Sequence, residues 1–294
     1  MTVAAQQVPP AGTLVLDHIS HFVPDLGAAR RALQDLGFIV TPESAQVTQD
    51  GPAGTSNICV MLEHGYLEIL APTMDTPNAR RLQATMDRYP GVHLACFGTP
   101  DAEGEFHRLT DHGFAPPPTV HLSRKVASGE TVRFSVVRAS PEAMPEGRVQ
   151  FVQHLAPEVI WRPEYLGHAN GVLKLAAVLV VAADPVDDGA RWAEFTALLP
   201  QPAGGYVHLA SHRGDILLGR REQWRELLGT APPAPGIAGY ALECRDAKGL
   251  AARCSTLGLR PRMLRDDLYA AAFPAALGGA FVFGTREALG LEQA

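Results

Sequence analysis

A glutamate interrupts an otherwise apolar segment at Glu68, in the sequence YLEILAP (66–72). In a strand, side chains alternate between the two faces, so Tyr66, Glu68 and Leu70 would share one face. A carboxylate on a buried face is costly unless it is paired with a charge or binds a cation. The sequence therefore predicts that Glu68 is a metal ligand and catalytic group, or that it forms an ion pair with an arginine across the sheet.

The same strand end occurs a second time further along the chain. The segment VQHLAP (152–157) repeats the L-A-P ending, and this alignment places Gln153 opposite Glu68, with His154 beside it. We expect Gln153 to be a neutral oxygen ligand or a substrate-binding group. In a regular strand His154 would point to the opposite face. Strand ends are often irregular, so His154 is also a candidate metal ligand and catalytic group.

Four segments share one pattern, which indicates an internal repeat. Each has an apolar strand, an Asp that can cap a helix, and a helix with one apolar face; the segments are 16–38, 92–114, 175–200 and 237–259. The capping residues are Asp25, Asp101, Asp184 or Asp187, and Asp246. Strand-like runs follow the helices, so the predicted unit is β-α-β-β-β, used four times in an α+β fold.

The repeat and the Pro- and Gly-rich segments predict two lobes of two modules each. Residues 1–13 are expected to be a flexible N-terminus. The first lobe would cover 14–170, with modules 14–72 and 92–157, and would carry the site. The second lobe would cover 171–294, with modules 172–220 and 236–286. No carboxylate stands at the matching strand positions of the second lobe, which favours a role as scaffold or dimer surface.

The overall composition excludes several classes of function. The chain has 294 residues and a net charge of -6, without a basic stripe, so no nucleic-acid partner is expected. Apolar runs near 175–183 are too short to cross a bilayer, and no signal peptide is recognisable, so no membrane partner is expected. Four scattered cysteines without a C-x-x-C pair are typical of buried thiols in a reducing cytoplasm. A homodimer is one option.

Three segments, in this order and spacing, resemble the vicinal oxygen chelate superfamily and above all its glyoxalase-like branch. They are LDHISHFVPDLGAARRALQDLGF, GTSNICVMLEHGYLEILAP and VQFVQHLAPEVIWRPEYLGHANG. The superfamily includes glyoxalase I, methylmalonyl-CoA epimerase and extradiol dioxygenases. The resemblance implies that each lobe is a curled mixed β-sheet barrel with helices outside. It also implies a divalent metal or a small substrate in the cleft.

The same resemblance places His18 at the family's first metal-ligand position. Imidazole suits Zn, Ni, Mn, Fe or Co, and the predicted ligands are His18, Glu68 and His154. The alternative is that His18 lines the barrel and makes an ordinary hydrogen bond. In the second module Leu94 matches His18, and His93, one residue away, would join the site only through a β-bulge.

Four further residues are candidates for substrate binding. Asn57, in the GTSN segment, and Tyr66 would line the cleft, although Asn57 could equally be a turn residue and Tyr66 a core residue. Arg162 could hold a substrate carboxylate and Trp161 could wall the pocket. The alternative for these two is a linker between the lobes that packs on the surface.

Three functions follow from this reading. The first is a divalent-metal-dependent lyase or isomerase that acts on a small carbonyl-containing substrate, with the metal polarising an oxygen and a carboxylate or histidine moving the proton. The second is a non-catalytic small-molecule binding protein for sequestration or resistance, which the incomplete ligand set favours. The third is an extradiol-type dioxygenase, which requires two histidines and a glutamate within one module.

Overall fold

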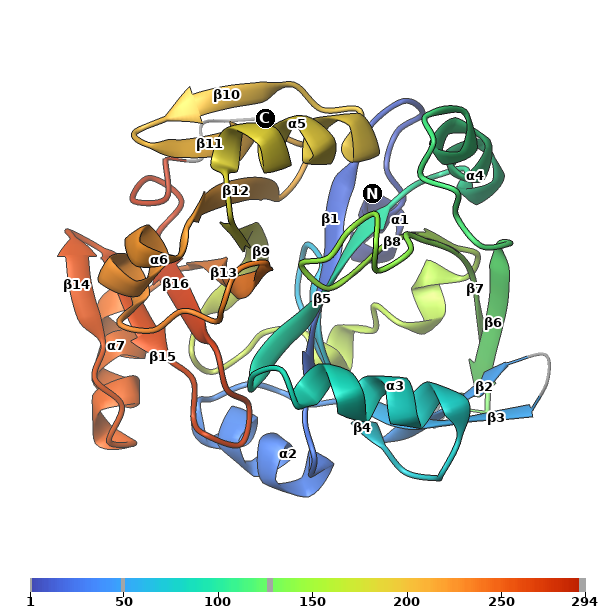
Figure 1. Ribbon diagram of the computed structural model, residues 1–294. Helices are drawn as coiled ribbons and strands as arrows, with labels where there is room; N and C mark the ends of the chain where they lie inside the picture. Colours follow the sequence, from blue (N-terminus) through green and yellow to red (C-terminus); the bar gives the residue numbers. More distant parts are fainter. Residues whose placement is uncertain (1, 49–50, 126–128, 291–294) are drawn as a thin grey trace.

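The computed structural model describes residues 2–48, 51–125 and 129–290, and they form two lobes, each built on an eight-stranded sheet (Figure 1). In the first lobe the strands close into a barrel in the order β1-β4-β3-β2-β6-β7-β8-β5. These strands are β1 (Val15–Phe22), β2 (Ser44–Thr48), β3 (Gly51–Met61), β4 (Tyr66–Pro72), β5 (Gly91–Gly98), β6 (Val120–Lys125), β7 (Thr131–Arg138) and β8 (Arg148–His154). The predicted α+β fold of paired modules is confirmed.

The two halves of the barrel have the same connectivity, as the repeat predicted. Strand β1 runs parallel to β4, β5 runs parallel to β8, and β1 and β5 join the halves antiparallel. Helices α2 (Leu26–Asp35) and α4 (Ala102–Asp111) follow β1 and β5. Asp25 accepts a bond from Ala28 N and Asp101 accepts one from Gly104 N, so each carboxylate caps its helix. A further helix, α3 (Pro77–Met86), connects the halves.

The second lobe repeats this connectivity in an eight-stranded sheet with the order β10-β11-β12-β9-β13-β16-β15-β14. Its strands are β9 (Val172–Ala182), β10 (Pro200–Ala203), β11 (Tyr206–Leu209), β12 (Asp215–Arg220), β13 (Gly236–Cys244), β14 (Arg262–Arg265), β15 (Leu268–Ala272) and β16 (Ala280–Gly284). Helices α5 (Pro185–Thr196) and α7 (Ala247–Thr256) are capped by Asp184 and Asp246. The choice between Asp184 and Asp187 as the cap is thereby settled for Asp184.

Helix α6 (Arg221–Leu228) is an addition to the second lobe that the repeat did not predict. It contacts β9, β12, β15 and β16, and its Trp224 and Leu228 pack on Ala177, Leu179 and Val282. Trp224 donates from its indole nitrogen to Val180 O at 2.7 Å. The apolar face of α6 therefore covers the face of the sheet that corresponds to the inside of the first-lobe barrel.

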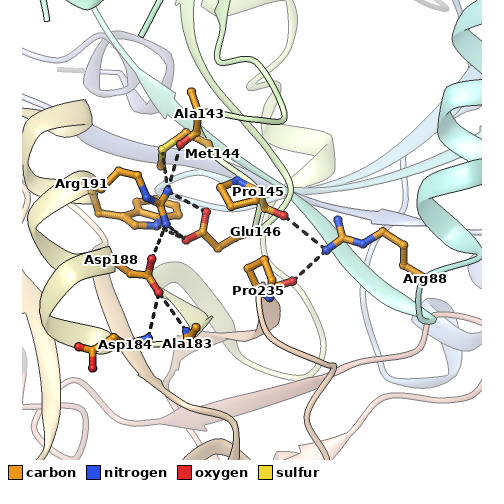
Figure 2. Close-up of polar contacts among 11 residues, drawn as sticks. Arg88, Ala143, Met144, Pro145, Glu146, Ala183, Asp184, Asp188, Arg191 and Pro235 are labelled. Carbon is orange, nitrogen blue, oxygen red and sulfur yellow. Dashed lines mark hydrogen bonds and ion pairs between the residues drawn. The ribbon is translucent and has the colours of Figure 1, made fainter. Parts of the chain in front are cut away.

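The lobes share one apolar core and a buried polar contact. Residues of both lobes, Ile19 and Phe97 with Trp192 and Phe281 among them, belong to a single buried cluster. Figure 2 shows the polar contact, in which fully buried Glu146 of the β7–β8 loop pairs with Arg191 and accepts a bond from Trp192 Nε1 at 3.0 Å. The carboxylate is thus fixed from the opposite lobe.

Two short segments close one end of the barrel. Residues 3–7, within the segment expected to be flexible, form α1 (Val3–Gln7), whose buried Gln7 donates to Glu63 O at 2.8 Å. Helix α1 contacts the turn η1 (Pro157–Val159), which is followed by η2 (Pro163–Tyr165). No helix among the described residues has the length and apolar character that crossing a membrane requires.

Candidate functional site

The inside of the first-lobe barrel is a cavity into which both halves project side chains. The volume open to the centre of a water-sized sphere is about 80 Å³. A single water molecule needs roughly 10–15 Å³ by the same measure. The cavity therefore has room for a small ligand. The lining residues are His18, Gln46, Val47, Asn57, Tyr66, Glu68, Leu70, Leu94, Leu122, Ser123, Phe134, Val136, Arg138, Arg148, Gln150 and Val152.

His18 projects into this cavity from β1 and is held in one orientation. Its Nδ1 lies 2.6 Å from Asp17 Oδ1, and its ring stacks on Tyr66 with the centroids 4.4 Å apart. Burial opposes protonation, but contacts with Cys96 and Asp17 raise the pKa of His18 well above its usual range. Asp17 is therefore the hydrogen-bond partner that orients the ring of His18.

Asp17 is one of the site residues that sequence reasoning missed. Strand β1 has one extra residue between Leu16 and His18 relative to β5, and this β-bulge breaks the alternation that would have separated Asp17 from His18. Asp17 bonds to His18 and also to His154 Nε2, at 2.9 Å. Burial opposes its ionisation, but His154 and His18 hold the pKa of Asp17 well below its usual range. The sequence signal was a carboxylate directly before a histidine in an apolar strand.

Glu68 projects into the cavity from β4, next to β1. Its Oε1 accepts bonds from Asn57 Nδ2 at 2.6 Å and from Gln46 Nε2 at 3.4 Å. No arginine in the described part of the chain lies within ion-pair distance of Glu68. The carboxylate is therefore oriented by amides, and Asn57 is a side chain of the cavity and not a local turn residue.

The strand register differs by three residues from the alignment of the two barrel halves that the sequence repeat suggested. Ser20 of β1 pairs with Glu68, and the matching Cys96 of β5 pairs with Gln150. Gln150, and not Gln153, thus matches Glu68 and lines the cavity. Gln153 lies on the other face of β8, where its amide donates to Pro100 O at 2.7 Å and accepts from Ala102 N at 3.3 Å. It supports the start of α4, so the substrate-binding role expected for it has no basis in this placement.

His154 lies behind the cavity wall and not among the lining residues. Its ring packs edge-on against Trp161 and Phe134, with centroids 5.0 and 5.3 Å away, and its Nε2 bonds to Asp17. His154 therefore connects to His18 through a shared carboxylate. It does not meet His18 and Glu68 in a common donor group.

Trp161 and Arg162 occupy different environments. Trp161 is buried at the closed end of the barrel, contacts Tyr66 with centroids 5.7 Å apart, and donates from Nε1 to Leu62 O at 3.2 Å. Arg162 pairs with Glu130 at 3.2 Å and with Glu164 at 2.8 Å on the surface, and it does not line the cavity. Its expected contact with a substrate is thus not supported by its position, because it already has two carboxylate partners.

His93 points away from the cavity, as its position one residue from Leu94 implies. Its Nε2 lies 2.7 Å from Tyr89 O, and its ring packs on Tyr89 with centroids 4.1 Å apart. Burial, opposed by the Tyr89 carbonyl, lowers the pKa of His93 to about 4. Leu94 lines the cavity instead. His93 is therefore a neutral structural residue.

A different group of side chains could hold a metal. Among the described residues, one set of three His, Cys, Asp or Glu donors has its ligand atoms within 4.8 Å of one another, namely Asp17, His18 and Cys96. All three are buried. The expected set of His18, Glu68 and His154 does not form such a group. The cavity also contains Arg138 and Arg148, which the sequence reading did not single out.

Comparison with solved structures shows how widely this fold is used. A hypothetical protein from Staphylococcus aureus superposes with a TM-score of 0.65 at 12% identity, covering 92% of this chain and 99% of that one. The Mn(II)-bound glyoxalase from Novosphingobium aromaticivorans gives 0.55 at 11% identity, covering 93% and 82%. The 2,3-dioxygenase LapB from Pseudomonas sp. KL28 gives 0.56 at 12% identity, covering 94% and 93%. At these identities the likeness concerns the fold alone.

The family itself is shown by sequence. No curated protein matches the chain at a significant level. Residues 16–196, more than half of the chain, match the model of the glyoxalase-like domain, and the match includes β1 with His18, β4 with Glu68 and the whole barrel. The chain therefore belongs to the family of glyoxalase-like domain proteins, as the sequence resemblance predicted.

Proposed function

We propose that the first-lobe barrel is the active site of a divalent-metal-dependent lyase or isomerase that acts on a small carbonyl-containing substrate. One observation carries this proposal: His18 and Glu68, from adjacent strands, face the same enclosed cavity. An imidazole and a carboxylate directed at one ligand are the groups that proton transfer next to a carbonyl requires. The lining has apolar residues on several strands, which limit the water around them.

The donor set suits a divalent transition metal. Asp17, His18 and Cys96 would hold it, because they bring a carboxylate, an imidazole and a thiol within 4.8 Å, and Zn, Ni, Mn, Fe or Co accept ligands of these kinds. A bound metal would supply Lewis-acid polarisation of the substrate oxygen. Metal binding requires deprotonated ligands, so it would compete with the proton that His18 and Asp17 share.

Glu68 has the position of the proton-transfer group. Both of its hydrogen bonds are made through Oε1, to Asn57 and Gln46. They fix the orientation of the carboxylate and leave Oε2 to accept a proton from the carbon next to a substrate carbonyl. Because Glu68 lies outside the group of metal donors, binding and proton transfer are assigned to different residues.

The second candidate function is non-catalytic binding of a small molecule on the same scaffold. The observation that favours it is the second half of the barrel, where Leu94 and Gln150 occupy the positions that match His18 and Glu68. Only one half of the barrel then offers a donor pair. A protein that sequesters a ligand needs the cavity but neither the metal nor the base.

Metal analysis together with hydrogen exchange separates the two candidates. In D2O, the enzyme should exchange the hydrogen next to the carbonyl of small aldehydes and ketones, as followed by NMR. E68Q should lose this exchange and retain the rise in melting temperature on adding Mn, Ni or Zn, whereas H18Q should lose both. A wild-type protein without metal, without a metal-dependent rise and without exchange would contradict the enzyme proposal and favour binding.

A further inference from the structure

Two arginines stand at one end of the barrel cavity. Arg138 is the last residue of β7 and Arg148 the first residue of β8, and these antiparallel neighbours bring both side chains to the same end of the cavity. In the register Arg138 pairs with Gln150, two residues from Arg148. All three side chains line the cavity.

Neither guanidinium has an acidic partner in the described part of the chain. Neither Arg138 nor Arg148 forms an ion pair there, and Arg138 Nε is buried without a hydrogen-bond acceptor. Arg148 lies over the ring of Phe22, 5.3 Å from its centroid. Glu68, the one carboxylate of the cavity lining, is hydrogen-bonded by Asn57 and Gln46. Both arginines thus line the cavity without a carboxylate partner among the described residues.

The cavity carries an excess of positive charge. Burial and the nearby Arg138 lower the pKa of Arg148, against an opposing effect of Glu68, to about 10, so Arg148 remains a cation at neutral pH. Among the described lining residues, two guanidinium groups thus face the single carboxylate of Glu68. Enclosed charge of one sign is unfavourable unless a counter-ion compensates it. Both arginines retain partial exposure, as entry of a counter-ion requires.

We propose that the barrel binds a small organic monocarboxylate, and that Arg138 and Arg148 hold its carboxylate group. The inference rests on the proposed function, because it assigns a substrate class to the same cavity. Guanidinium groups match a carboxylate in planarity and donor spacing, and they bind it through paired hydrogen bonds. With the carbonyl that the reaction requires, the substrate class becomes small oxo acids.

A carboxylate fits the cavity better than a phosphate does. Among the described lining residues, two guanidinium charges and one carboxylate leave a single positive charge, which one carboxylate neutralises and a dianionic phosphate overcompensates. Gln150 adds a second point of recognition, because its Oε1 is buried without a donor among the described residues. A hydroxyl or N–H group of the ligand would satisfy this oxygen.

The register places the reacting group within reach of the carboxylate site. Cys96 pairs with His18 on one side and with Gln150 on the other, so Gln150 and His18 lie at the same level of the barrel. Arg148 lies two residues away along β8, which corresponds to roughly 7 Å along a strand. A chain of a few carbon atoms would connect the arginine end with His18.

Ligand binding by the metal-free protein tests this inference without any need for activity. Calorimetry and thermal melting would compare pyruvate, 2-oxobutyrate and acetoacetate with their methyl esters, and with inorganic phosphate and sulfate. We expect at least one oxo acid to raise the melting temperature, and its ester to be at least tenfold weaker. If no acid exceeds its ester, or if phosphate and sulfate bind as tightly as the acids, the inference is overturned.

Three variants locate the effect at the cavity. R138M and R148M should each weaken binding of the oxo acid at least tenfold, and R148K, which keeps the charge but not the paired bonds, should be intermediate. The free R148M protein should melt no lower than wild type, because an unpaired charge has been removed. R225M is the control, since Arg225 is exposed on α6 of the second lobe, outside the cavity lining, and it should bind like wild type.

The outcome separates this inference from the proposed function. Undiminished binding by R148M and R138M would overturn the inference while leaving the metal and exchange results of H18Q and E68Q as they are. Conversely, carboxylate binding without metal or exchange would support the inference and contradict the enzyme proposal.

Discussion

The two lobes have the same connectivity, but the first contains a cavity lined by polar and apolar side chains, whereas the inward face of the second is filled by apolar side chains. In the first lobe, His18 of one half matches Leu94 of the other half, and Glu68 matches Gln150. The corresponding positions of the second lobe are Ala177, Leu217, Gly239 and Val282. They follow from the spacing to the helix caps and from the strand register. None of these four can bind a metal or transfer a proton through its side chain.

This difference shows that the repeated module determines the arrangement of the strands. The side chains that point inward determine whether a lobe can bind a metal or transfer a proton. In the second lobe α6 packs Trp224 and Leu228 against the inward face, which removes the space that a ligand would need. In the first lobe the corresponding space is enclosed by strands on all sides. The second lobe contributes instead the partner for Glu146 and half of the shared core.

The largest effect is expected from removing the indole side chain that packs on the inward face of the second lobe. W224A removes a fully packed indole and its bond to Val180 O, so we expect a loss of about 4 kcal/mol in the free energy of unfolding, measured by urea denaturation. W224F should lose clearly less. Metal and ligand binding in the first-lobe barrel should persist in the folded variant. Loss of binding in a folded W224A would show that the two inner faces are coupled.

An intermediate effect is expected from pH at the contact between the lobes. His21 of β1 bonds to Tyr240 Oη at 3.0 Å and to Leu277 O at 3.1 Å, and burial, assisted by His93, lowers its pKa to about 4. The unfolded chain, with a histidine pKa of about 6.5, binds more protons between these values. The free energy of unfolding should therefore fall as the pH drops, by about 2 kcal/mol between pH 7 and pH 5 for this residue.

The variant H21Q isolates this contribution. Its stability should change less between pH 7 and pH 5 than that of wild type, by about the same 2 kcal/mol, in urea denaturation at each pH. H107Q is the matched control, because the His107 side chain is 68% exposed on α4. An H21Q protein with the pH dependence of wild type would assign the effect to other groups.

The smallest effect concerns matched helix caps of the two lobes. D25A removes the bond to Ala28 N, and D184A removes bonds to Val186 N and Asp187 N. Each should cost about 1 kcal/mol in the free energy of unfolding. D184A should cost a few tenths of a kcal/mol more, because Asp184 also pairs with exposed Arg220 at 3.0 Å. Equal losses would show that this surface pair contributes nothing measurable.

The sequence was sufficient for features that follow from local physics. The Asp caps and the repeated module predicted the helices and the paired halves, because capping and amphipathic periodicity are visible over short windows. Glu68 was singled out as a polar residue in an apolar strand, whereas His18 was singled out by the resemblance to the family. Both line the cavity of the structure.

The residues whose positions were not predicted depend on the pairing register of the strands. This register cannot be read from a local sequence pattern. Shared letters aligned Gln153 with Glu68, whereas strand pairing matches Glu68 with Gln150. The bulge at Asp17 arises from pairing with β5 and reverses the face that simple alternation would assign. Arg138 and Arg148 were not singled out from the sequence, and they line the cavity because the barrel closes.

Because the two lobes share one core, the first lobe is a poor candidate for use as an isolated domain. Ile19 and Phe97 pack in the same buried cluster as Trp192 and Phe281, and fully buried Glu146 depends on Arg191 and Trp192 from beyond the barrel. A fragment cut after the eighth strand would expose this apolar surface and leave a carboxylate without its partners. A protein engineered to contain the cavity must therefore also contain the second lobe, although the described lining residues all belong to the first lobe.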